Sequence, residues 1–68
     1  MSNTLGDELP RQMARVRDEL LPAYDSIPAG ALAATLMRAD LDAAAKAMAE
    51  GDIVAMVRIC KKLQSWSL

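Results

Sequence analysis

The 68-residue chain lacks histidine and phenylalanine and has a single cysteine, Cys60. Without histidine, one chain cannot assemble a Cys-His or Ser-His catalytic pair. A lone thiol supplies neither a disulfide nor the roughly four ligands of a structural zinc site. We therefore expect a protein that is not an enzyme and holds no metal or other cofactor, with Cys60 serving as a small core residue.

The chain also has no large excess of positive or of negative charge. Eight basic residues face nine acidic ones, for a net charge of −1, so the strongly basic balance of a dedicated nucleic-acid binder is absent. The first residues have neither the basic nor the apolar region of a secretory signal, and no apolar run approaches the ~20 residues of a membrane span. Because an unpaired thiol suits a reducing compartment, we expect a cytoplasmic protein without a membrane partner.

Apolar side chains recur at intervals of three and four along the first part of the chain, which places them on one side of a helix. This apolar seam consists of Leu5, Leu9, Met13, Val16, Leu20, Tyr24 and Ile27. We predict a helix over about residues 8–26, capped by Thr4 or Asp7, with Pro10 in its first turn. Pro22 removes a backbone hydrogen bond and collides with the carbonyl four residues earlier. Since the seam continues beyond Pro22, we expect a kink there rather than a break.

Two more helices follow. Residues 29–50 are rich in alanine and contain no proline, which strongly favours a helix. Gly51 suits the left-handed position after a helix, and Asp52 suits the cap of the next helix, predicted over residues 52–65. The segment from Ala43 to Met56 resembles the small-residue helix, Gly-Asp turn and following helix of tetratricopeptide-type repeats. Both the tight turn and this resemblance imply an antiparallel helical hairpin.

A single core of this size contributes only about 3–5 kcal/mol, and self-association is the common supplement when disulfides and metals are absent. We therefore predict one all-α domain over residues 1–68, frayed at 1–6 and 66–68, which assembles as a homodimeric helical bundle. The predicted helix 29–50 is apolar on two flanks, and either flank could form the interface. The expected interface residues are Leu32 and Leu36 on one flank, Met37, Leu41 and Met48 on the other, and Trp66 at the chain end.

Asp40 interrupts the apolar arc of the predicted helix 29–50. A buried carboxylate is costly unless it is paired. We expect Asp40 to form a structural pair with Arg15, with Arg17 or with a backbone amide, either inside the subunit or across the dimer.

These features favour a small non-catalytic interaction or regulatory module that acts as a homo-oligomer and binds another protein. The alternative is a dimeric nucleic-acid-binding regulator. Arg58, Lys61 and Lys62 lie on the outer face of the third predicted helix and could contact phosphates. The same cations would also complement the negative end of the helix dipole on an ordinary solvated surface.

Overall fold

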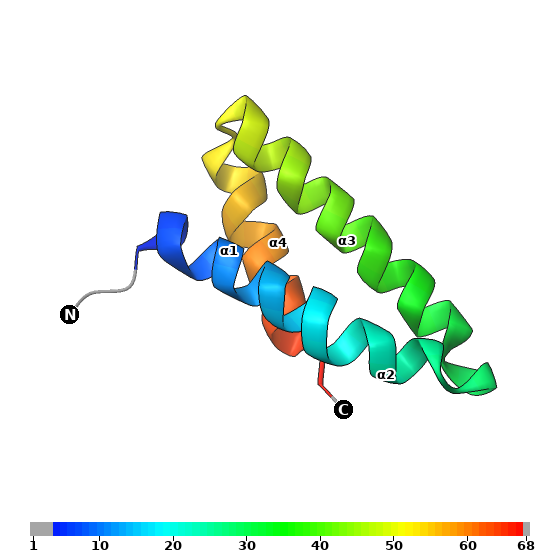
Figure 1. Cartoon of the computed structure of the whole chain (residues 1–68). Helices are drawn as coiled ribbons and strands as arrows, with labels where there is room; N and C mark the ends of the chain where they lie inside the picture. The colour runs from blue at the N-terminus through cyan, green and yellow to red at the C-terminus, as the bar shows by residue number, and fades with distance from the viewer. Residues whose placement is uncertain (1–3, 68) are drawn as a thin grey trace.

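The computed structural model describes residues 4–67, and this part of the chain is helical with no strand. The first arm comprises α1 (Leu5–Arg15), a π-helical turn η1 (Val16–Leu20) and α2 (Leu21–Asp25). A 3-10 turn, η2 (Pro28–Gly30), leads into the second arm, α3 (Ala31–Glu50), and the third arm is α4 (Ile53–Ser65). Figure 1 shows α2 meeting the start of α3 at one corner, while α4 crosses behind the first arm. The prediction of an all-α fold with three helices is confirmed.

The first helix begins earlier than predicted, at Leu5 rather than near residue 8. Thr4 is the cap, because its hydroxyl oxygen accepts a hydrogen bond from the backbone N–H of Asp7 at 3.2 Å. Pro10 consequently lies beyond the first turn, contrary to our expectation. Pro10 has no N–H to donate to the carbonyl of Gly6. Because this missing hydrogen bond lies close to the N-terminal end of the helix, its loss disturbs little of the helix.

The helix continues past Pro22 as predicted, but the distortion lies in the turn before the proline. From Val16 to Leu20 the helix widens, and the N–H of Leu21 bonds to the carbonyl of Val16, five residues back. A widened turn of this kind is a known cause of helix bending, and it replaces the regular turn into which the ring of Pro22 would collide.

The widened turn also keeps the apolar seam on one side. Leu5 and Tyr24 are 19 residues apart. In a regular α-helix, with about 100° of rotation per residue, their side chains would point in directions about 100° apart. One extra residue in the widened turn compensates for this drift. Leu5 and Tyr24 therefore both pack against the same core.

The corner between α2 and α3 depends on a close backbone approach. Gly30 is buried there, and a Cβ atom at this position would lie 2.3 Å from the backbone oxygen of Tyr24. Only glycine fits this contact without a backbone shift. The predicted helix over 29–50 is thus a 3-10 turn followed by a regular helix from Ala31.

The turn between α3 and α4 matches its prediction. Gly51 adopts the left-handed conformation, with φ at 66°. The Asp52 carboxylate accepts a hydrogen bond from the N–H of Ala55 at 3.1 Å and caps α4. From this turn α4 packs against both α3 and α1.

The core is a single layer between the three arms, in a molecule that measures 36 × 26 × 15 Å. Its buried hydrophobic residues are Leu9, Val16, Leu20, Ala34, Met37, Ala44, Ala47, Met56, Cys60 and Leu63. Met37 was predicted to lie at a dimer interface, and this prediction is wrong because Met37 is fully buried within one chain. The first arm packs over that flank of α3 and uses Met37 and, in part, Leu41 in its own core.

The chain ends differ from the expectation that residues 1–6 and 66–68 fray. Leu5 and Gly6 belong to α1, and hydrogen bonds from Trp66 and to Ser67 hold the segment after α4. Residues 1–3 and 68 lie outside the described part of the chain. Within residues 4–67, no helix is both long and apolar enough to cross a membrane.

Candidate functional site

Asp40 is buried as predicted, with 7% of its surface exposed, but its partners differ from the prediction. One carboxylate oxygen pairs with the ammonium of Lys62 at 2.8 Å, and the other accepts a hydrogen bond from the indole N–H of Trp66 at 3.0 Å. The expected pair with Arg15 is not formed. The guanidinium of Arg15 instead donates to the backbone oxygen of Leu63 at 2.7 Å and to the side chain of Gln12.

These contacts fasten the last turn of α4 to the other two arms. Lys62 and Trp66 are one helical turn apart and reach the same carboxylate on α3. Arg15 holds the carbonyl of Leu63 from the first arm, and the hydroxyl of Tyr24 donates to the carbonyl of Ser67. Among the described residues, no buried side-chain nitrogen or oxygen lacks a partner. We therefore assign Asp40 a structural role, and Trp66 is already engaged within the chain.

Cys60 lies inside the core. Only 5% of its surface is exposed. Burial raises the pKa of the Cys60 thiol, and the negative charge of Glu8 raises it further. A thiol with a raised pKa is a poor nucleophile at neutral pH. Residues 4–67 contain no group of three or more side chains suited to holding a metal ion.

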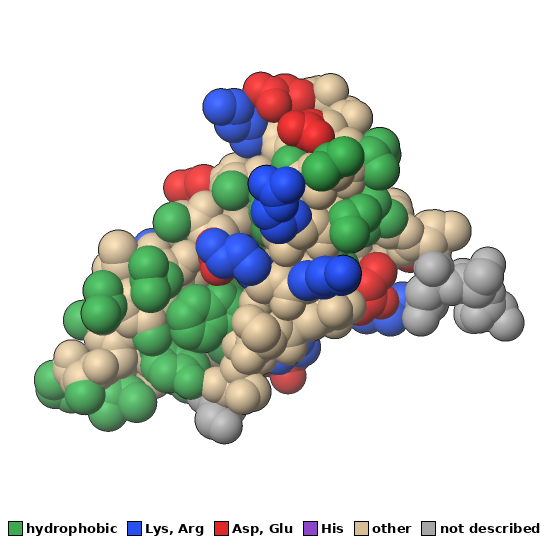
Figure 2. Space-filling model, turned by 180° about the vertical axis from the view of Figure 1, so that it is seen from behind, with side chains coloured by type: hydrophobic (Ala, Val, Ile, Leu, Met, Phe, Trp, Pro, Cys, Tyr) green, Lys and Arg blue, Asp and Glu red, His purple; other side chains and the backbone are tan. Residues whose placement is uncertain are grey.

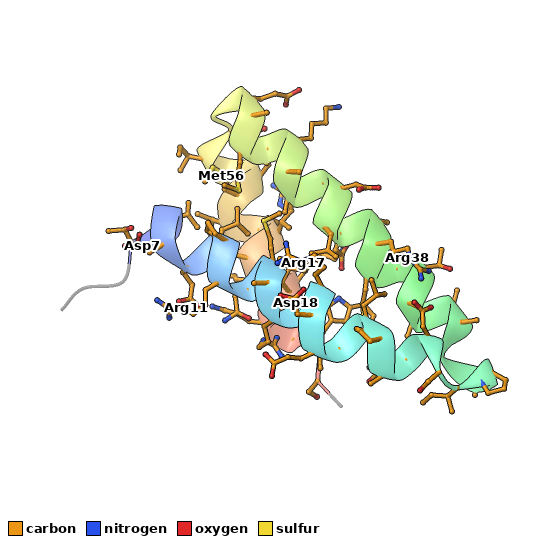
Figure 3. The ribbon with its side chains drawn as sticks, viewed as in Figure 1. Asp7, Arg11, Arg17, Asp18, Arg38 and Met56 are labelled. Atoms are coloured by element: carbon orange, nitrogen blue, oxygen red, sulfur yellow. The ribbon has the colours of Figure 1, made fainter. Side chains whose placement is uncertain are left out.

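Three arginines on the surface have acidic partners. Arg11 pairs with Glu8 at 2.9 Å, Arg17 with Asp18 at 2.9 Å, and Arg38 with Asp25. Figure 3 shows Arg17 beside Asp18 on the first arm and Arg38 on α3. Such exposed pairs contribute little stability, so these residues are ordinary solvated surface.

The predicted cationic face of Arg58, Lys61 and Lys62 is divided in the structure. Lys62 turns toward α3 and pairs with Asp40. Arg58 and Lys61 remain exposed on the outer flank of α4, and neither forms an ion pair with a described residue. Two cations, rather than three, are thus available on this surface.

The same flank of α4 also exposes apolar residues. Ile53 is 60% exposed and Val57 is 41% exposed, and Val54 beside them is 67% exposed. The inward face is instead set by Met56, Cys60 and Leu63, which are buried. The outer residues line a shallow hollow of about 410 Å³, which we call the α4 hollow: Ile53, Val54, Val57, Arg58 and Lys61.

A second apolar surface lies at the corner between α2 and α3, and it includes Leu32 and Leu36 from one of the two flanks that we expected to form an interface. Leu32 is 71% exposed and Leu36 is 48% exposed, and Ile27 in the preceding turn is 51% exposed. We call these three residues the corner patch. Figure 2 shows hydrophobic side chains gathered at this corner and again near the start of α4, with lysine and arginine side chains between the two areas. Met48, from the other predicted flank, is 39% exposed.

No protein-family model matches this chain, and no curated protein or solved structure is significantly similar to it. The two exposed apolar surfaces are therefore the features of this chain that bear on its function.

Proposed function

We propose that this chain is a small, non-catalytic protein-interaction or regulatory module that acts as a homodimer in the cytoplasm. In each subunit, residues 31–50 and 53–65 form an antiparallel hairpin, and two subunits pack as a helical bundle through the corner patch. The observation that supports this proposal is the exposure of Ile27, Leu32 and Leu36 together at one corner. A contiguous apolar patch on a small protein typically marks an interaction site.

The shape of the molecule supports the same proposal. Its shortest dimension is 15 Å, against 36 and 26 Å for the other two. A slab this thin buries few residues completely, so a second copy adds burial that a single chain lacks. Each leucine or isoleucine that becomes fully buried contributes about 1.5–3 kcal/mol. Ala39 and Ala43 continue the flank of Leu36 along α3, and their small side chains allow a second helix to approach closely.

Two matched substitutions test the proposal. Leu32 and Val54 are each the second residue of a helix, and they are 71% and 67% exposed. An aspartate at either position lies near the positive end of the helix dipole, so both variants should fold. We expect the wild type and Val54→Asp to sediment at about twice the 7.3 kDa chain mass. Leu32→Asp should sediment as a folded monomer.

Two results would contradict the proposal. The first is a wild type that remains monomeric across the accessible concentrations, with a melting temperature that does not change on dilution. The second is a Leu32→Asp variant that dimerises as well as the wild type, which would place the interface elsewhere.

The alternative, a nucleic-acid-binding regulator, receives less support because Lys62 is engaged with Asp40. It makes a separate prediction. A dimer that contacts phosphates through Arg58 and Lys61 would bind duplex DNA or RNA with an affinity that falls steeply as salt rises. Absence of binding at about 50 mM salt would remove this alternative.

A further inference from the structure

The α4 hollow combines apolar and basic side chains in an order suited to a helical partner. Ile53, Val54 and Val57 occupy the first two turns of α4, and Arg58 and Lys61 follow directly. Val54, Val57, Arg58 and Lys61 are spaced as i, i+3, i+4 and i+7, so they form one continuous strip along the helix. The strip is apolar at one end and positively charged at the other.

Neither cation of the strip forms an ion pair with another residue of the range 4–67. Four other basic residues, Arg11, Arg17, Arg38 and Lys62, each pair with a carboxylate, whereas Arg58 and Lys61, like Lys46 on α3, pair with none of the described residues. Arg58 and Lys61 differ from Lys46 in lying beside the exposed branched residues of the hollow. Unpaired cations beside an exposed apolar cluster favour a ligand that carries negative charge next to apolar side chains.

We propose that the α4 hollow binds an acidic amphipathic helix of a partner protein. The apolar ridge of that helix lies against Ile53, Val54 and Val57, and its carboxylates contact Arg58 and Lys61. An amphipathic helix presents apolar anchors at the same three- and four-residue spacing as the strip. This inference deepens the proposed function, since it names the class of partner, but it does not require the dimer.

Other ligands match the hollow less well. A nucleic-acid backbone offers phosphates but no apolar ridge for the three branched side chains. A second copy of the chain is proposed to bind at the corner patch, a different surface that Figure 2 shows to be separated from this one by basic side chains.

The test is a selection from a phage-displayed library of helical peptides of about 18 residues, with the wild-type protein as bait. We expect the enriched peptides to carry apolar residues three and four apart, flanked by glutamate or aspartate. Their affinity should fall about tenfold for the double variant Arg58→Glu/Lys61→Glu and for Val54→Asp. Leu32→Asp is the matched control and should bind as the wild type does. Peptides with glutamate replaced by lysine should regain binding to the double variant.

Several outcomes would overturn the inference. One is an enriched set without acidic residues, or with an affinity that the Arg58→Glu/Lys61→Glu change leaves unaltered. Another is binding of phosphatidylglycerol-containing vesicles or duplex DNA, but of no acidic peptide, through the same residues. A third is loss of the dimer in Val54→Asp, which would make a second copy the occupant.

The two proposals can fail separately. A monomeric wild type that selects acidic peptides refutes the homodimer and leaves this inference standing. A wild-type dimer that selects none refutes the inference alone.

Discussion

The indole N–H of Trp66 and the ammonium of Lys62 contact the two oxygens of one buried carboxylate, that of Asp40, at 3.0 and 2.8 Å. The contact joins the last turn of α4 to the middle of α3. Because a buried polar group without partners is costly, the position of α4 is tied to these two contacts with Asp40.

Replacement of the indole should reveal the contribution of its hydrogen bond. We expect Trp66→Phe, which keeps an aromatic ring but removes the N–H donor, to lower the free energy of unfolding by about 1–2 kcal/mol. Urea denaturation followed by circular dichroism measures this change. In an Asp40→Leu background the same substitution should cost almost nothing, since the acceptor is gone. An equal cost in both backgrounds would show that ring packing, and not the hydrogen bond, is responsible.

The two turn glycines should differ in their tolerance of alanine. Gly30→Ala places a Cβ atom 2.3 Å from the backbone oxygen of Tyr24, and we expect a loss of about 3 kcal/mol. At Gly51 there is space for a side chain but φ is 66°, so Gly51→Ala should cost only about 1–2 kcal/mol. Thermal or urea unfolding of the two variants gives the comparison. A milder effect at Gly30 than at Gly51 would mean that the α2–α3 corner can shift apart.

Cys60 should resist thiol reagents in the folded protein. Its burial raises the pKa of the thiol, so the thiolate is scarce at neutral pH. Because the folded pKa lies above the unfolded value, the free energy of unfolding should also decrease as pH rises above the ordinary pKa of cysteine. Labelling with Ellman's reagent measures the reactivity. A Cys60→Ser/Val57→Cys variant, with its thiol on the exposed flank of α4, serves as the rapidly labelled control, and equal rates would contradict the burial argument.

The pKa of Glu8 should depend on Gln12. The amide of Gln12 donates to the Glu8 carboxylate at 2.6 Å and is the main cause of the lowered pKa, with a smaller contribution from the charge of Arg11. We expect Gln12→Ala to raise the pKa of Glu8 toward its ordinary value in an NMR titration. Asp18, whose pKa is lowered by Arg17, should not change and serves as the internal reference.

The lowered pKa of Glu8 also predicts how the free energy of unfolding changes on acidification. A carboxyl group with a folded pKa below its unfolded pKa stabilises the fold above the unfolded value and loses this contribution as pH falls through the folded value. Glu8→Gln should therefore show a weaker loss of stability on acidification than the wild type. A steeper loss would contradict the assignment.

Local sequence rules predicted most of the helices. Gly51 and Asp52 act within a few residues of their own positions, so the end of α3 and the start of α4 were predictable. The start of α1 was misplaced because Thr4 and Asp7 are both acceptable caps, and only the geometry distinguishes them. The widened turn before Pro22 was not predicted in form, although the proline indicated a distortion there and the apolar seam indicated that the helix continues.

The site was less predictable, because it depends on which elements pack together. The position of Asp40 on an apolar face correctly indicated burial, but Lys62 lies 22 positions away along the chain and becomes its partner only when α4 folds back. The orientation of α4 likewise decides that Ile53 and Val57 face outward. A signal was available in the width of the apolar arc on this helix. Ile53, Val54 and Val57, taken together with Met56, Cys60 and Leu63, span about 180° of the helix circumference, more than the stripe of about 100° that one buried face usually needs.

The π-helical turn at Val16–Leu20 has a consequence for how this chain tolerates changes in length. Deletion of one outward-facing residue there, such as Glu19, would restore ordinary α-helical geometry and leave the flanking side chains oriented as before. Pro22 would then meet an unwidened turn, so the shortened protein should need Pro22→Ala as well. Homologues one residue shorter in this segment are accordingly expected to lack the proline.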